Sequence, residues 1–158
     1  MNTLRRVPGP RYEALLQLLR TAETLWNASR VFFARWDLSP SQFNILNLIA
    51  DLPGGLTQAG LSRQLLMHRS NVTGLVDRLE ARGIVKREDQ EGDRRAYRVV
   101  LTADGRRLVE SILPHYYTVA EDVWGRFPAH RANHLVADLK HISANAEHMA
   151  GTYSLEPA

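Results

Sequence analysis

The feature that most constrains this fold is a change of hydrophobic period at Gly83. Ahead of Gly83, apolar residues recur at i, i+3, i+4 and i+7, which predicts a helix with one apolar stripe. The stripe consists of Val72, Leu75, Val76 and Leu79. Gly83 predicts the end of this helix, because glycine readily adopts the left-handed conformation that follows a last turn.

Beyond Gly83 the period falls to 2, which is typical of strands. Residues 84–87 predict a short strand, and the alternation at Tyr97, Val99 and Leu101 predicts a second one. The polar residues 89–94 include a glycine and predict the loop between them. The sequence therefore predicts a β-hairpin directly after the helix.

Helical patterns precede this region. Residues 11–36 predict a long helix buried on more than one side, because they hold too many apolar residues for one stripe. Ser39 followed by Pro40 predicts the cap and first residue of a second helix, with Phe43, Leu46 and Ile49 inward. Thr57 predicts the cap of a short helix over residues 58–66, whose start we expect to be weakly held because Gly60 cannot complete a capping box.

Two more helices are predicted after the hairpin. Thr102 predicts the cap of a helix over residues 103–127, in which Pro114 predicts a kink or a break. Pro128 predicts the start of a final helix that ends near Gly151. The expected fold class is therefore mainly α with a small β-hairpin (α+β), with a winged helix-turn-helix over residues 38–102.

Composition narrows the function. The chain has 158 residues and is 44% hydrophobic, which is typical of one globular domain, or of one core with helical extensions. It has no cysteine, which excludes disulfides, thiolate metal sites and thiol redox sensing. Residues 63–107 hold eleven Lys and Arg against seven Asp and Glu, a balance of +4 that exceeds the +3 of the whole chain. A basic centre of this kind suits a polyanionic partner.

The sequence predicts no membrane partner. No apolar run approaches ~18 residues, and no apolar signal core follows the N-terminal Arg5 and Arg6. We therefore expect a cytoplasmic protein. No Gly-rich phosphate loop, nucleophile elbow or paired-acid motif is present, so we do not expect an enzyme.

The first turn of the helix ahead of Gly83 is unusual for a solvated surface. It carries Arg69, Ser70, Asn71 and Thr73, where Glu and Lys would serve solubility. The second helix of a helix-turn-helix enters the major groove, and these residue types hydrogen-bond to bases and phosphates there. Gly74 adds little bulk and lets the helix approach closely. The alternative is an ordinary polar helix start, capped at His68 by a residue less suited than Ser or Asp.

The predicted hairpin loop is the second candidate contact. Its tip carries Arg94 and Arg95, and an arginine on a narrow loop is attracted into the minor groove. Asp93 lies two positions before Arg95 and is expected to pair with that guanidinium and fix its direction. The alternative is an ordinary charged turn.

The residues "LTQAGLSRQLLMHRSNVTGLVDRLEARGIVKREDQEGDRRAYRVVLTADG" resemble the core of the MarR (multiple antibiotic resistance regulator) family of bacterial transcription factors. The likeness extends more loosely to "LSPSQFNIL" and to the flanking helices. The most specific part is the Asp-x-Arg of the hairpin followed by a strand and Leu-Thr-x-x-Gly. The resemblance implies a homodimer held by residues 11–37 and 103–150. It also implies that residues 38–102 bind one half of a pseudo-palindromic operator in double-stranded DNA.

The resemblance also implies individual roles. The family's base contacts map onto Ser70, Asn71, Thr73 and Gly74, its phosphate contacts onto Arg69 and Arg78, and its hairpin pair onto Asp93 and Arg95. Two positions depart from the family pattern. Gly60 replaces a common acidic residue, and His68 replaces a small polar one, which puts the capping of the recognition helix in doubt.

Members of this family often bind small aromatic acids, which implies a small aromatic or phenolic ligand. A cation near several rings suits an aromatic carboxylate. The candidates for such a pocket are Trp26, Arg30, Phe33, Trp36, Phe43, Tyr116 and Tyr117. The alternative is that these aromatic residues belong to the core and the dimer interface.

Histidines on the last predicted helix were the remaining candidates for chemistry. His130 and His134 lie four apart, a spacing that can share a metal. His134, His141 and His148 fall seven apart with polar residues between them, which is typical of the polar side of an amphipathic helix. We therefore expect neither a metal nor a cofactor. The sequence predicts a ligand-responsive repressor, and a winged helix used only for protein contacts remains the alternative.

Overall fold

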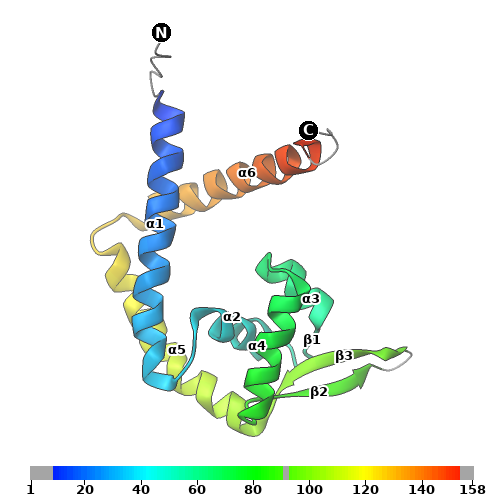
Figure 1. Cartoon of the computed structure of the whole chain (residues 1–158). Helices are drawn as coiled ribbons and strands as arrows, with labels where there is room; N and C mark the ends of the chain where they lie inside the picture. Colours follow the sequence, from blue (N-terminus) through cyan, green and yellow to red (C-terminus); the bar gives the residue numbers. More distant parts are fainter. Residues whose placement is uncertain (1–8, 91–92, 154–158) are drawn as a thin grey trace, which may run out of the picture. The chain divides into compact units, whose positions relative to one another are not determined.

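The computed structural model describes residues 9–90 and 93–153, and the side chains of residues 90, 93–96 and 153 lie outside this description. The chain divides into two compact units, Met1–Ile112 and Leu113–Ala158. The boundary falls inside a helix. Figure 1 shows the elements of both units, which are described separately below.

The first unit contains most of the buried core. In chain order it holds α1 (Pro10–Phe33), the 3₁₀ turn η1 (Ala34–Trp36), α2 (Pro40–Ala50), α3 (Gln58–Leu65) and α4 (Arg69–Ala81). The predicted start of α2 is confirmed, because Ser39 and Gln42 form a reciprocal capping box. The side chains with less than 2% exposure lie mainly on α2, α3, α4 and the sheet, and include Phe43, Ile49, Leu61, Val76 and Val99.

The start of α3 is half of a capping box. The Thr57 hydroxyl accepts a hydrogen bond from the Gly60 N–H at 3.1 Å, which confirms the predicted cap. Gly60 has no side chain to return a bond, as expected. The α3 helix ends at Leu66, whose backbone is left-handed at a φ of 51°.

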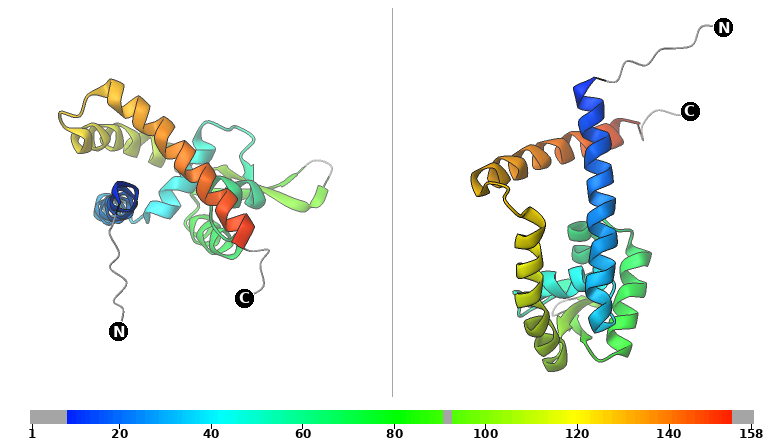
Figure 2. Two further views of the ribbon diagram at one scale, coloured as in Figure 1. Left: turned by 90° about the horizontal axis from the view of Figure 1, so that it is seen from above. Right: turned by 90° about the vertical axis from the view of Figure 1, so that its left-hand side faces the viewer.

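A three-stranded antiparallel sheet completes this unit, in the order β1-β3-β2. The strands are β1 (Leu56–Thr57), β2 (Val85–Gln90) and β3 (Asp93–Leu101). Two expectations were wrong here. The strand β1 was not predicted, and most of the predicted loop over residues 89–94 belongs to β2 and β3. The hairpin projects beyond the helices of its unit, so its outer residues have no core to face and show no apolar alternation (Figure 2).

The α1 helix is not buried on more than one side of the single chain, contrary to expectation. Only Phe32 and Phe33 are buried, whereas Leu19 is 59% and Val31 is 76% exposed. The N-terminal part of α1 extends beyond α2, α3 and α4 (Figures 1 and 2). Its apolar residues therefore exceed what this chain covers.

The second unit contains the last part of α5 (Ala103–Trp124) and all of α6 (Ala129–Tyr153). Of the kink or break predicted at Pro114, the break is wrong, because α5 continues through this residue. Proline removes one backbone donor, and the loss of a single bond does not end a helix of 22 residues. The helix ends at Trp124, ahead of Gly125 with its φ of +54°. Within the described residues, no helix is long and apolar enough to cross a membrane.

Candidate nucleic-acid interface

The C-terminal end of α4 is closed by backbone hydrogen bonds. The Gly83 N–H donates to the Glu80 carbonyl at 2.8 Å, and the Ile84 N–H donates to the Leu79 carbonyl at 3.0 Å. Gly83 has a φ of +69°. This is a Schellman motif, and Leu79 and Ile84 are both buried beside it. The predicted stop at Gly83 is therefore confirmed.

The start of α5 locks onto the same end. The Thr102 hydroxyl donates to the Gly83 carbonyl at 2.6 Å and accepts from the Gly105 N–H at 3.0 Å, which confirms Thr102 as the cap. A Cβ on Gly105 would lie 2.0 Å from the Ile84 carbonyl oxygen. The Leu-Thr-x-x-Gly motif therefore joins the recognition helix, the hairpin and α5 at one point.

Arg82, the residue after α4, ties this end to the turn that follows α1. Its guanidinium donates to the Trp36 carbonyl at 3.1 Å and to the Asp37 carbonyl, and lies 3.8 Å from the Asp37 carboxylate. Asp37 has a left-handed backbone, with a φ of 53°. Arg82 therefore satisfies two carbonyl groups at the end of η1 that a helix end leaves without partners.

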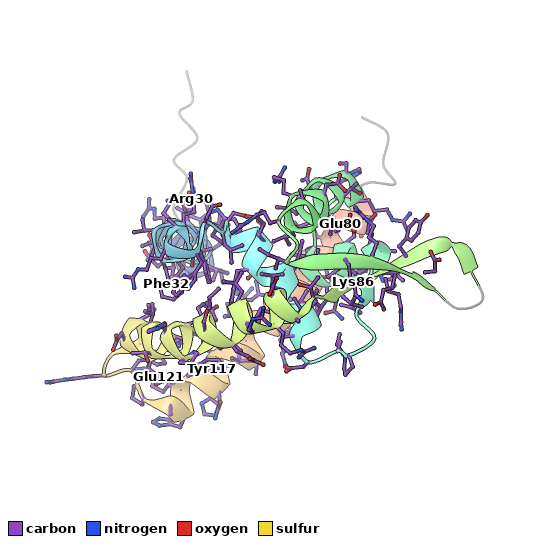
Figure 3. All side chains as sticks on the ribbon, turned by 90° about the horizontal axis from the view of Figure 1, so that it is seen from below. Arg30, Phe32, Glu80, Lys86, Tyr117 and Glu121 are labelled. Carbon is purple, nitrogen blue, oxygen red and sulfur yellow. The ribbon has the colours of Figure 1, made fainter. Side chains whose placement is uncertain are left out.

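Arg87 on β2 attaches the hairpin to α4. Its guanidinium forms ion pairs with Asp77 and Glu80, and its backbone N–H donates to Glu80 at 3.0 Å. Partial burial lowers the pKa of Arg87, but the hydrogen bond to Asp77 and the charge of Glu80 more than offset this, so its pKa lies above the usual value. Figure 3 labels Glu80 on α4 and Lys86 on the neighbouring strand β2.

The N-terminal end of α4 is different. His68 is the N-cap residue by its backbone, yet its side chain accepts no hydrogen bond from the helix. Its Nδ1 lies 2.9 Å from the Ser70 hydroxyl instead. The doubt about this cap is therefore confirmed. The first-turn N–H groups have no capping side chain, and an anion can bind there.

Three predicted contact residues on α4 have no partner. Within the part of the chain that the structure describes, the side chains of Arg69, Asn71 and Arg78 form no hydrogen bond or ion pair. All three are exposed. The guanidinium of Arg78 lies 3.6 Å from where a Cβ on Gly74 would be. These polar groups are therefore free to bind another molecule.

Thr73 is only partly free. Its hydroxyl donates to the Arg69 carbonyl at 3.0 Å and lies 3.4 Å from the Gln58 amide oxygen. The group that remains for a base is its methyl, which can contact the methyl of thymine. The predicted role of Thr73 thereby narrows to an apolar contact.

The hairpin contacts stay predictions. The backbones of Asp93, Arg94 and Arg95 lie in β3, and Gln90 pairs with Asp93. Their side chains lie outside the described residues, and so does the expected pairing of Asp93 with Arg95.

The predicted ligand set is divided between the two units. Trp26, Arg30, Phe33, Trp36 and Phe43 belong to the first unit, and Tyr116 and Tyr117 belong to the second. The rings of Phe33 and Phe43 stack at 4.3 Å and are almost fully buried, so they are core residues. Arg30 and Phe32 point to opposite sides of α1 (Figure 3).

A hollow of about 320 Å³ lies beside Arg30. It is lined by Arg30, Ala34, Asp37, Leu38, Ser39, Pro40 and Gln42. Arg30 alone comes from the predicted ligand set, and the hollow has no aromatic lining. On α6, the rings of His130 and His134 are 6.5 Å apart. In residues 9–90 and 93–153, no three His, Cys, Asp or Glu side chains are grouped to hold a metal ion.

Four functional residues of this region were missed from the sequence. Asp77, Glu80, Arg82 and Arg87 counted only toward the charge balance. Asp77 and Glu80 lie three apart on one helix face, and Arg87 lies on the strand that follows, which was the available signal for that cluster. No sequence signal points to the partners of Arg82, because they are backbone carbonyls 45 and 46 positions away.

Two short helices, an exposed first turn on the second of them, and a hairpin define a winged helix-turn-helix, a class of DNA-binding fold. The MarR family model matches residues 36–96. The transcriptional regulator HosA of Escherichia coli O157:H7 is 33% identical over 101 residues, which cover 61% of this chain and 74% of HosA. The chain therefore belongs to the MarR family of transcriptional regulators.

Solved structures share the fold. The Staphylococcus aureus MepR–DNA complex matches with a TM-score of 0.74 at 18% identity, over 85% of this chain and 97% of that chain. The structure of CouR from Rhodococcus jostii RHA1 bound to p-coumaroyl-CoA matches with a TM-score of 0.72 at 24% identity, over 80% of this chain and 88% of that chain.

Proposed function

We propose that this MarR-family regulator is a homodimeric repressor that binds a pseudo-palindromic operator and releases it when a small aromatic ligand binds. The observation that carries the DNA contact is the free first turn of α4. Arg69 and Asn71 of that turn have no partner within the described residues, although the C-terminal end of the same helix is held by four separate attachments. Arg78, in the last turn, is also without a partner there.

The roles of the contact residues follow from their chemistry. Asn71 is suited to a bidentate contact with adenine, and the methyl of Thr73 to thymine. Ser70 contacts a base edge, and Gly74 lets the helix sit close to the groove. Arg69 and Arg78 bind phosphates. Arg94 and Arg95 enter the minor groove from the hairpin, with Asp93 orienting Arg95. The DNA complex of MepR, which has a similar fold, supports DNA binding but not the individual contacts.

The exposed apolar residues support a dimer. Residues 11–37 and 103–150 form the dimerisation region in this proposal, and residues 38–102 bind DNA. Leu19, Val31, Val123 and Met149 are examples of apolar side chains in that region that are more than half exposed in the single chain, and such surfaces mark interaction sites. Two recognition helices about 34 Å apart would read successive major grooves.

The ligand step is a shift of population. The dimer can adopt different spacings of its two recognition helices. A ligand that binds more tightly to the dimer in one spacing increases the population of that spacing. Arg30 lines the hollow described above and supplies a cation there for a carboxylate. The p-coumaroyl-CoA complex of CouR supports a ligand with a phenolic ring. In this proposal the protein regulates transcription in the cytoplasm and is not an enzyme.

The test is selection from a random duplex library by the purified full chain at near-physiological salt, followed by sequencing of the retained DNA. We expect an enriched pseudo-palindrome with half-sites about one helical turn apart. Retention that is weak, salt-sensitive and without sequence preference would contradict the sequence-specific part. An absence of retention would favour the alternative, a winged helix used only for protein contacts.

A further inference from the structure

Arg87 is the outermost residue of β2 whose side chain is described in contact with α4, and one residue further out β3 is still paired with β1, Arg98 with Thr57. Arg87 lies on β2 and pairs with Val99 of β3, which is fully buried. The next residues outward, Glu88 and Asp89 on β2 and Tyr97 and Arg98 on β3, are exposed. The side chain of Arg87 is 21% exposed, whereas no residue of the hairpin outward of it is buried among those whose side chains are described.

The attachment is specific in geometry. Three separate donors of Arg87 are used: one guanidinium nitrogen binds Asp77, the other binds Glu80, and the backbone N–H binds Glu80 at 3.0 Å. Asp77 and Glu80 lie on successive turns of α4. A planar guanidinium bonded to two turns of a helix fixes an orientation as well as a distance.

We propose that Arg87 is a positioning residue that sets the angle of the hairpin to the recognition helix, so that Arg94 and Arg95 reach DNA while α4 lies in the major groove. This inference rests on the proposed function. The hairpin tip, where Gln90 pairs with Asp93, lies three residues beyond Arg87, or about 10 Å. A tilt of roughly 10° at Arg87 therefore moves the tip by about 2 Å, more than the ~0.5 Å tolerance of a positioned contact.

A simpler role for Arg87 is charge neutralisation. Asp77 and Glu80 are carboxylates on the helix that enters the groove, and without Arg87 they would repel phosphates. The two roles separate in the triple variant Asp77→Asn, Glu80→Gln, Arg87→Met, which removes both the contact and the negative charge. Lys86→Met is the matched control, because Lys86 on the same strand pairs with Glu88 at 2.7 Å and not with α4.

The experiment measures operator affinity by fluorescence anisotropy for the full-chain variants, at a temperature where thermal unfolding shows each of them folded. We expect Arg94→Gln/Arg95→Gln to weaken binding about tenfold or more, and Arg87→Met to weaken it to a similar degree. The triple variant should stay weak, and Lys86→Met should change affinity less than about twofold. In the Arg94→Gln/Arg95→Gln background, Arg87→Met should have almost no further effect.

Three outcomes would overturn the proposal in different ways. Equal losses from Arg87→Met in both backgrounds would show that Arg87 does not act through the hairpin arginines. Recovery of wild-type affinity in the triple variant would show that Arg87 acts only by neutralising the charges of Asp77 and Glu80. Unchanged affinity in Arg94→Gln/Arg95→Gln would instead refute the hairpin contact of the proposed function, and the positioning role with it.

A readout without DNA keeps the test independent of the operator. The chain has no cysteine, so Asp89→Cys accepts a single nitroxide label on the hairpin. We expect the label to move faster when Arg87→Met is added, and Arg87→Lys to restore part of the restriction. An unchanged spectrum would contradict the attachment.

Discussion

The two ends of α4 are built in opposite ways. At the C-terminal end, Gly83, Thr102, Arg82 and Arg87 connect the helix to α5, to the turn after α1 and to the hairpin. At the N-terminal end, His68 supplies no side-chain cap, and the side chains of Arg69 and Asn71 are exposed and have no partner among the described residues. Because α4 is held at its C-terminal end, its N-terminal end is presented to a partner in a fixed position.

This difference indicates which substitutions in α4 affect folding and which affect binding. Substitutions at the attached end change the free energy of unfolding, because they leave buried groups unpaired or crowded. Substitutions at the free end change partner binding and leave unfolding nearly unaffected. The predictions below either break one end or sharpen the contrast, in order of expected size.

Gly105→Ala breaks the attached end most severely. The new Cβ would lie 2.0 Å from the Ile84 carbonyl oxygen, which is backbone and cannot turn aside. We expect a loss of about 3 kcal/mol in the free energy of unfolding, measured by urea denaturation. Gly74→Ala is the matched control, because its nearest neighbour is the Arg78 guanidinium at 3.6 Å. That variant should be as stable as the parent or more so, and a similar loss in both would contradict the contrast.

Asn71→Ala tests the free end. Its side chain has no partner among the described residues, so its removal should leave the unfolding midpoint unchanged within about 0.5 kcal/mol. Operator binding should weaken by about 2 kcal/mol, with relaxed preference at one base pair of each half-site. Competition between single-base operator variants measures both effects. Unchanged preference would remove Asn71 from base readout.

Arg82→Met breaks the tie to the turn after α1. The guanidinium loses two carbonyl acceptors and Asp37, and its side chain is one-third exposed, so we expect about 1.5 kcal/mol of destabilisation in thermal unfolding. Arg78→Met is the control, because Arg78 lies one turn earlier on α4 and has no partner among the described residues. It should leave unfolding unchanged while weakening DNA binding and reducing its salt dependence. Equal stability of the two variants would show that the Arg82 tie does not hold α4.

Thr73 gives the smallest effect and the most selective one. Thr73→Val keeps the methyl and loses the hydroxyl, whereas Thr73→Ser keeps the hydroxyl and loses the methyl. We expect Thr73→Ser to weaken binding by about 0.8 kcal/mol at a thymine-containing site, and Thr73→Val to retain the preference. The reverse order would mean that the hydroxyl leaves the Arg69 carbonyl and contacts the base.

Local sequence signals predicted the recognition helix well. The apolar stripe, the stop at Gly83 and the caps at Ser39, Thr57 and Thr102 involve residues within a few positions of one another, and all are confirmed. Strand β1 was not predicted, because two residues are too few to show an alternating pattern. Leu56 becomes a strand residue only by pairing with Val99. The outer part of the hairpin was not predicted as strand, because its exposed residues show no apolar alternation.

The site divides in the same way. The candidate contacts of the first turn could be proposed from residue type and position alone. The Arg82 tie could not, because it joins residues 45 positions apart through backbone carbonyls. The expected burial of α1 failed for a related reason: apolar content shows that a surface needs covering, but the single chain leaves side chains such as Val31 exposed.

Hydrogen exchange of the operator complex tests the central claim most directly. In the free protein, we expect amides of residues 75–84 to be protected and those of residues 68–73 to exchange faster, because they lie at the uncapped end. Operator DNA at saturation should slow exchange in residues 68–73 and leave residues 75–84 nearly unchanged. Unchanged exchange in residues 68–73 under saturating operator would contradict the claim that the free end of α4 binds DNA.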